Sequence, residues 1–129
     1  MNESWKEHLT ANQNKLANDL ETIFKIPVFG DEATKTELAE AENYFLIVYG
    51  DMQLTNTEGS LAQDVYVVYV SEDNPNVEFT TLDIISVGSK VKGITFGRTI
   101  KERVQKGKTE DYFDRVTVIF RRMLKYDTR

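Results

Sequence analysis

The spacing of apolar residues near the start of the chain predicts an amphipathic helix from Trp5 to Phe24. Apolar side chains recur there at intervals of three, four and seven, so they share one helical face. Ser4 followed by Glu7 predicts a capping box at the start of this helix. Ile26-Pro27 ends the pattern, because the residue before a proline disfavours helix. The predicted apolar face is formed by Trp5, Leu9, Leu16, Leu20, Ile23 and Phe24.

Four later segments have the alternation, or the dense β-branched and aromatic content, that is typical of strands. They are Tyr44–Tyr49, Leu61–Val70, Ile94–Lys101 and Tyr112–Lys125. Turn-forming residues at 55–60 join the first two strands, and Gln105–Thr109 predicts a glycine-containing hairpin connection between the last two. The acidic, alanine-rich stretch from 30 to 43 is predicted to be a loop with one helical turn at 36–41.

The second predicted strand is apolar on both of its faces. Val65, Val67 and Tyr69 point to one side of the sheet, and Tyr66, Val68 and Val70 point to the other. One face can pack against helices, which leaves the other to meet a second layer or a neighbouring subunit. The sequence therefore predicts an additional contact surface on the sheet.

A second helix is predicted from about Thr81 to Val91, between the two pairs of strands. Thr80 with Asp83 three residues later resembles a capping box, and Gly93 lies where a left-handed C-cap is expected. The order helix-strand-strand-helix-strand-strand predicts an α+β fold with a mostly antiparallel sheet and helices packed on one face. The length of 129 residues and the lack of a biased linker predict a single domain over residues 1–129.

Charge is divided unevenly along the chain, within a net charge of −5. Residues 1–97 hold six Lys or Arg against sixteen Asp or Glu, and residues 98–129 hold ten against five. Such a division is typical of nucleic-acid contact or of charge-complementary assembly with another subunit. The alternative is that the fold mixes these charges over one surface, and the sequence leaves both open.

Composition and motifs remove several classes of chemistry. The chain has no cysteine, which excludes disulfides, thiolate catalysis and cysteine-ligated metals. No apolar run approaches the roughly 18 residues of a spanning helix, and the first residues do not resemble a signal peptide. Its glycines match neither a phosphate-binding loop, nor a dinucleotide fingerprint, nor a nucleophile elbow. We therefore expect no cofactor and no metal site.

His8 and two pairs of acids are the remaining candidates for catalysis. His8 is the only histidine, and no Ser, Cys or second His motif accompanies it, so an exposed helix residue is the favoured interpretation. Asp51 with Asp64, or Asp111 with Asp114, could do acid–base work only in surroundings that made one an acid and the other a base. Nothing in the sequence places either pair in an apolar pocket, so we expect no enzyme.

Basic residues gather on the last two predicted strands. Alternation places Arg115 and Arg121 on one face, and can place Arg98 of the neighbouring strand alongside them. Such guanidinium groups suit phosphates or a partner's carboxylates, or else form cross-strand pairs with acids such as Glu102 and Asp111. Aromatic residues cluster elsewhere, which disfavours sequence-specific nucleic-acid binding. The candidate subunit-interface residues are Arg98, Arg115, Arg121 and Arg122.

The middle and end of the chain resemble small neck proteins of long-tailed bacteriophages and prophages. The resemblance rests on Val65–Val70 with the turn after it, on Leu82–Val91 and Ile94–Glu102, and on Arg115–Arg122 within the closing sequence VTVIFRRMLKY. It covers about residues 5–125 and is nearest to the tail terminators, or tail-to-head joining proteins, which have the minor tail protein U fold.

This resemblance implies a structural protein that caps the tail tube as a ring, expected to be a hexamer, and joins the tail to the head. The implied partners are further copies of the chain, the tail tube protein and the head connector or stopper protein, with no membrane. The implied location is the tail or neck of the virion, and the host cytoplasm during assembly. Alternatives are another neck or tail-completion component, a cellular adaptor that binds a protein through an exposed sheet edge, and a small enzyme that uses an acid pair.

Overall fold

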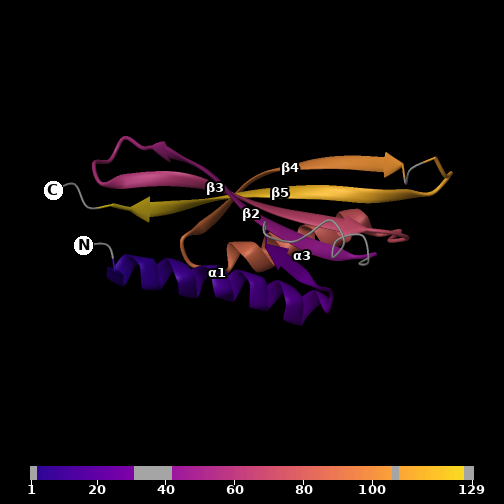
Figure 1. Cartoon of the computed structure of the whole chain (residues 1–129), viewed down its shortest axis with the longest axis horizontal. Coiled ribbons are helices and arrows are strands. Elements are labelled where there is room, and N and C mark those ends of the chain that lie inside the picture. The colour runs from indigo at the N-terminus through magenta and orange to yellow at the C-terminus, as the bar shows by residue number, and fades with distance from the viewer. Residues whose placement is uncertain (1–2, 31–41, 106–107, 127–129) are drawn as a thin grey trace.

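The described residues form a five-stranded sheet with two helices against one of its faces (Figure 1). The computed structural model describes residues 3–30, 42–105 and 108–126. The order of strands in the sheet is β1-β2-β3-β5-β4. The strands are β1 (Val28–Gly30), β2 (Tyr44–Leu54), β3 (Ser60–Ser71), β4 (Ile94–Gln105) and β5 (Tyr112–Lys125).

The sheet is mixed, and its antiparallel part is the larger one. β2, β3, β5 and β4 pair antiparallel with their neighbours, whereas the three residues of β1 pair parallel with β2. The predicted α+β class is confirmed, and so is the order of helices and strands apart from β1. Three residues directly after Pro27 are too few to show an alternation, so β1 has no recognisable sequence pattern.

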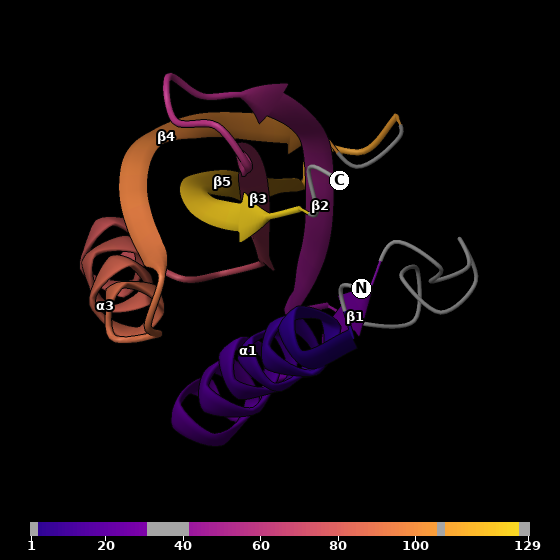
Figure 2. The same ribbon diagram turned by 90° about the vertical axis from the view of Figure 1, so that its left-hand side faces the viewer.

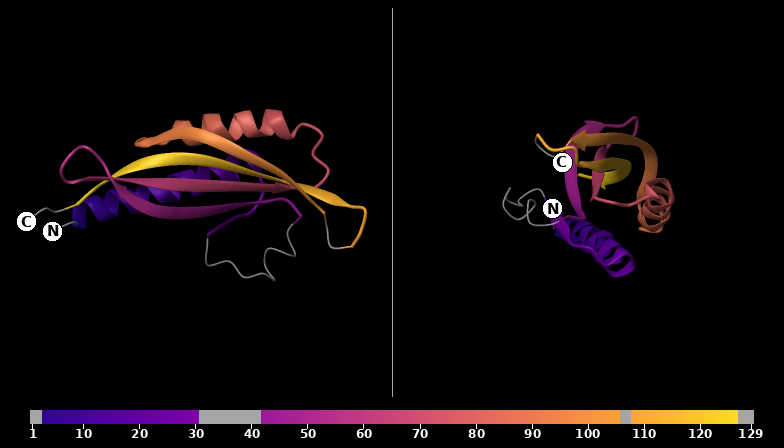
Figure 3. Two further views of the ribbon diagram at one scale, coloured as in Figure 1. Left: turned by 90° about the horizontal axis from the view of Figure 1, so that it is seen from above. Right: turned by 90° about the vertical axis from the view of Figure 1, so that its right-hand side faces the viewer.

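The four long strands extend along the molecule and curl strongly (Figures 2 and 3). Right-handed twist accumulates over strands of this length, and irregular pairing at Tyr49/Met52 and at Phe96/Arg98 bends them further. β2 continues to Leu54, five residues beyond the predicted end at Tyr49, and β4 continues to Gln105. β5 has the predicted bounds. The helical turn predicted at 36–41 lies outside the described residues.

α1 (Glu3–Phe24) packs along one face of the sheet, and its apolar stripe is the reason. Leu16 and Leu20 are fully buried against the strands. The helix ends at Phe24 as predicted, because Lys25 turns into the left-handed region with φ 59°. The predicted capping box is wrong, since the helix begins at Glu3 and already includes Ser4. Ile23 is exposed and does not belong to the buried stripe.

α3 (Val77–Ser89) covers the other part of the same face (Figure 2). It begins four residues before the predicted start, and the hydroxyl of Thr81 donates to the carbonyl of Val77 at 2.8 Å inside its first turn. The predicted cap at Thr80 is therefore wrong. Asn76 precedes the helix and makes no side-chain cap bond. Gly93 does have a positive φ of 86°, but it lies beyond the end of the helix.

The core lies between the two helices and the inner face of the sheet. Alternate residues of β2, β3 and β5 supply it, together with Leu16, Leu20, Ile84 and Val87 from the helices. Gly88 allows close approach, because a Cβ there would clash with the ring of Phe120. The two described helices lie on a single face of the sheet, which confirms that part of the prediction. The strand residues in the core are Phe45, Ile47, Val65, Val67, Tyr69, Val116, Val118 and Phe120.

Candidate subunit interface

The second face of the sheet is apolar at its centre, and we call it the open face. Strand register brings side chains of β2, β3, β5 and β4 together there, as the alternation in β3 predicts. The buried residues of both helices belong to the opposite face. Among the described residues, no helix therefore covers the open-face centre. It consists of Leu46, Val48, Tyr66, Val68, Ile100, Thr117 and Ile119.

Burial within this centre is uneven. Ile119 in β5 is only 8% exposed, whereas Ile100 on the neighbouring strand is 40% exposed. The ring of Tyr66 lies over Gly50, where an added Cβ would stand 2.7 Å from the ring. Large apolar side chains thus lie side by side on this face, as in the centre of a protein interface.

Three arginines surround the centre. Arg115 and Arg121 lie on the same strand six residues apart, which is about 20 Å along an extended chain. Arg98 is the register partner of Ile119 and is exposed on β4. The prediction that these three arginines share one face is confirmed. An apolar centre with a charged rim is the usual anatomy of an interface.

Two of the rim arginines already have acidic neighbours. Arg115 Nη2 donates to Glu102 Oε2 at 3.1 Å, which is one of the cross-strand pairs expected from the sequence. Arg121 Nη2 donates to Gln53 Oε1 at 3.1 Å, and its Nε lies 3.8 Å from Asp64 Oδ1. Exposed pairs of this kind contribute about 1 kcal/mol or less, so they exchange partners readily.

Tyr44 extends the open face toward β1. Its ring makes an edge contact with Phe29, with 5.9 Å between the ring centroids. Burial raises the pKa of Tyr44, and the positive charge of Arg115 partly offsets that shift. The phenol is therefore neutral at physiological pH. It adds an aromatic group with a hydrogen-bonding tip, a residue type enriched at interfaces.

Arg122 does not belong to this rim. Its side chain points to the helix-covered face and is only 5% exposed. Nε donates to Gln63 Oε1 at 2.9 Å, and the guanidinium lies 4.3 Å from the centroid of the Tyr49 ring. Inclusion of Arg122 among accessible interface residues is therefore wrong for the chain as it is folded. The alternation that groups Arg115 with Arg121 sends Arg122 inward.

β4 forms one edge of the sheet over twelve residues. Within the described ranges no strand pairs with its outer side, and almost all of its side chains are exposed. An irregular pairing next to Gly97 and the charged residues Arg98, Lys101 and Arg103 are features that discourage unspecific edge pairing. The edge is long enough to accept an added strand from a partner.

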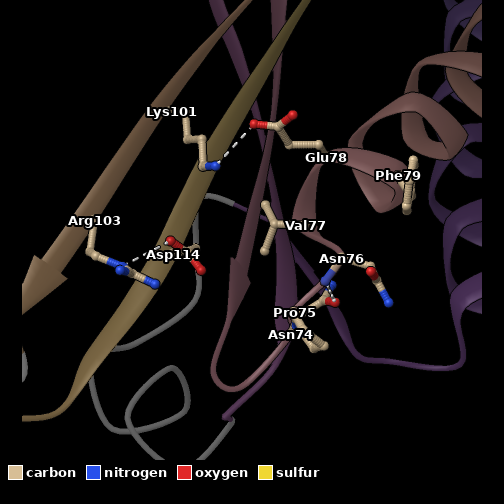
Figure 4. A pocket seen from close by; sticks show the side chains of 9 residues that line it. All are labelled: Asn74, Pro75, Asn76, Val77, Glu78, Phe79, Lys101, Arg103 and Asp114. Atoms are coloured by element: carbon tan, nitrogen blue, oxygen red, sulfur yellow. Dashed lines mark hydrogen bonds and ion pairs between the residues drawn. The ribbon is translucent and has the colours of Figure 1, made fainter.

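A pocket of about 590 Å³ lies between the start of α3 and the strands β4 and β5 (Figure 4). Two ion pairs lie in its lining: Lys101 Nζ is 3.4 Å from Glu78 Oε1, and Arg103 Nε is 3.5 Å from Asp114 Oδ1. Each charge in the pocket faces a charge of opposite sign, as the dashed lines in Figure 4 indicate. The Lys101–Glu78 pair ties α3 to the sheet, whereas the Arg103–Asp114 pair joins β4 to β5 within the sheet.

The register of β2 and β3 places Asp51 in the irregular stretch opposite Asp64, so this predicted pair of acids lies on adjacent strands. Asp64 faces Arg121 and Asp114 faces Arg103, so one acid of each predicted pair is engaged by a cation. His8 is exposed and stacks on the Trp5 ring, with 4.6 Å between the centroids. Among the described residues, no group of three or more His, Cys, Asp or Glu is placed to hold a metal ion. No helix in the described ranges is long and apolar enough to cross a membrane.

The uneven division of charge along the chain is partly evened out in space. Lys101 pairs with Glu78 and Arg121 pairs with Asp64, and each pair joins the basic part of the chain, residues 98–129, to the acidic part, residues 1–97. Arg103 and Arg115 instead pair within the basic part, with Asp114 and Glu102. The fold therefore mixes the two charged parts of the chain at Lys101 and Arg121, while charge-complementary assembly with another subunit stays a prediction.

Comparison with known protein families and with curated proteins finds no match for this chain. The function must therefore be argued from the surface itself. The sequence predicted the apolar second face of β3, and it predicted that Arg98, Arg115 and Arg121 lie on one face of the sheet. It did not find Leu46, Val48 and Ile100 as members of that face, because the dense apolar run of β2 and the polar β4 hide the alternation.

Proposed function

We propose that this chain is an assembly subunit whose open face binds a neighbouring subunit. The observation that carries the proposal is an apolar centre built from four strands and rimmed by Arg98, Arg115 and Arg121. Contiguous apolar surface of this kind is typical of protein–protein contact. The rim arginines can pair with carboxylates across the contact, where the guanidinium fork gives direction as well as attraction.

The assembly we propose is the neck of a long-tailed phage or prophage, with the chain acting as tail terminator. The support is the resemblance of Val65–Val70, Leu82–Val91, Ile94–Glu102 and Arg115–Arg122 to that class, together with a surface suited to subunit contact. In this role copies of the chain form a ring, proposed to be a hexamer, on the tail tube and join it to the head connector. The protein works without catalysis, in the virion and, during assembly, in the host cytoplasm.

A second candidate function is a cellular adaptor that binds an extended segment of another protein. The observation in its favour is the twelve-residue edge of β4, whose backbone groups are available to an added strand. The two candidates use different surfaces. An adaptor depends on the outer side of β4, and a ring subunit depends on the open face.

Deletion of the gene from its phage or prophage tests the assembly role directly. We expect full heads beside unjoined tails of abnormal length in negative-stain images of the lysate. Normal, joined virions would overturn the terminator role and leave the adaptor as the better candidate. A pull-down with the intact chain would then search for its partner.

Two charge reversals of equal size connect the role to the open face. Arg98→Glu changes the rim, whereas Lys90→Glu changes an exposed lysine just after α3. On complementation of the deletion, we expect Arg98→Glu to leave heads and tails unjoined and Lys90→Glu to restore joined virions. Circular dichroism checks that both variants are folded. Equal rescue by the two variants would remove Arg98 from the interface.

A further inference from the structure

Three residues that line one pocket at the N-terminal half of α1 each have a buried polar atom without a partner. These atoms are the indole Nε1 of Trp5, the amide Oδ1 of Asn12 and the guanidinium Nη1 of Arg122. All three residues line a pocket of about 190 Å³, which Lys92 and Lys125 also border. Native proteins leave few buried polar atoms unpaired. Three among the residues that line one small pocket therefore point to a partner for them.

The charge of Arg122 makes the case stronger. The residue is 95% buried, and in the described part of the chain no carboxylate lies within ion-pair distance of it. Its neighbours are the amide of Gln63 and the ring of Tyr49. Burial raises the pKa of the Tyr49 phenol, so this group stays neutral and supplies no negative charge. Gln63 is itself held, because its Nε2 donates to the carbonyl of Gly50 at 2.9 Å. A buried cation is normally paired with an anion.

We propose that this pocket binds a carboxylate group. Arg122 Nη1 and Trp5 Nε1 are donors, from which carboxylate oxygens can accept, while Asn12 Oδ1 is an acceptor, to which an N–H beside the carboxylate can donate. An acidic residue of a polypeptide offers both features, and a small organic acid offers the first. The proposal does not depend on the assembly role, since the pocket lies on the helix-covered side of the sheet.

Binding requires a small rearrangement of the lining. The three atoms do not contact solvent in the present side-chain positions. Trp5 and Asn12 lie on one edge of α1 and are only half-buried, so rotation of their side chains can open the path to Arg122. Asn12 is anchored meanwhile by Nδ2, which donates to the carbonyl of Lys92 at 2.6 Å. The pocket volume suits a single carboxyl-bearing side chain.

Trp5 is the only tryptophan, so its indole N–H gives one unambiguous NMR signal at the site. The full chain is titrated with sodium acetate, and separately with sodium chloride at the same ionic strength. We expect acetate, and not chloride, to shift the Trp5 indole signal and the Arg122 Nε–H signal to saturation. The same response to both salts would overturn the proposal. Tighter binding of inorganic phosphate than of acetate would overturn the assignment to carboxylates.

Neighbouring arginines give a matched pair of variants. Arg122→Gln should weaken acetate binding roughly tenfold or more, because a charged hydrogen-bond donor is lost. Arg121→Gln should leave it unchanged, because that side chain is on the open face. Arg122→Lys retains the charge but lacks the forked guanidinium group, so it should also weaken acetate binding. This variant replaces Arg122→Gln in the test if Arg122→Gln does not fold. Unchanged affinity in a folded Arg122 variant would overturn the proposal.

Two further titrations distinguish the source of the carboxylate. If a short peptide with one Glu binds more tightly than acetate, the ligand is a polypeptide. If the peptide binds equally well or more weakly, the ligand is a small organic acid. Asp127, which lies outside the described residues, is an acid of the chain itself and is replaced in Asp127→Asn. If acetate bound to Asp127→Asn but not to the unmodified chain, the carboxylate of Asp127 would be the ligand of the pocket, and the proposal of an external ligand would be overturned.

Discussion

The two faces of this sheet are built from the same strands but meet different surroundings. On the inner face, Val65, Val67 and Phe120 are fully buried under two helices. On the open face, Tyr66 and Val68 are only half-buried and screen one another. Apolar alternation is equally clear on both faces of β3. Hydrophobicity therefore does not by itself tell a core from a contact surface, and what distinguishes them is which face the helices cover.

Substitutions at adjacent positions of β5 should reveal this difference most strongly. Phe120→Ala empties the centre of the core and should reduce the free energy of unfolding by about 3–5 kcal/mol. Ile119→Ala removes a side chain that lies one position away on the open face, where neighbours can close over the gap, and should lose less than half as much. Urea denaturation of both variants measures the ratio. Equal losses would mean that the open face is packed like the core.

The neighbouring arginines extend the comparison to charge. Arg122→Glu places a carboxylate in a buried site beside the amide of Gln63, and should destabilise the fold by about 2–4 kcal/mol. Arg121→Glu brings a second acid close to Asp64 on an exposed surface, and should cost about 1 kcal/mol or less.

Thermal unfolding of the two single variants tests this difference. Similar melting temperatures for the two variants would contradict the separate placement of these arginines.

Two glycines allow the same test by addition of one methyl group. Gly88→Ala puts a Cβ against the ring of Phe120 in the closed core, and should destabilise the fold by about 1–2 kcal/mol after the gain in helix propensity. Gly50→Ala meets the ring of Tyr66, which can swing into solvent from the open face, so its cost should be under about 1 kcal/mol.

Chemical denaturation of both glycine variants gives the comparison. A Gly50→Ala variant that is the less stable of the two would show that Tyr66 is fixed in place, as in a packed layer.

Sequence reasoning recovered what depends on local pattern and missed what depends on partners in space. The β-branched run of β5 has the predicted bounds, and α1 ends at Phe24 before Pro27 as expected. The polar end of β2, residues 50–54, has no strand pattern of its own and is extended by pairing with β3. β1 is likewise a strand only because β2 lies next to it.

The candidate sites divide in the same way. Alternation could place Arg98, Arg115 and Arg121 together, because they lie on strands that are neighbours in the sequence. The pocket at Arg122 joins Trp5 and Asn12 of α1 to the end of β5, and that contact depends on how the helix crosses the sheet. A spacing rule holds no information on a contact between residues more than a hundred positions apart.

Alkaline pH should give the smallest difference between the two faces. Burial raises the pKa of Tyr49 on the inner face and of Tyr44 on the open face, each above the ordinary value of 10.0. The folded chain then retains these phenolic protons when the unfolded chain has begun to lose them, so the free energy of unfolding falls as pH rises past about 10. Tyr49→Phe should flatten this fall more than Tyr44→Phe, because the Tyr49 ring packs against the buried core and this burial outweighs the opposing charge of Arg122. Urea midpoints between pH 8 and 11 measure the slopes, and a steeper fall in Tyr49→Phe than in the unmodified chain would contradict the assignment.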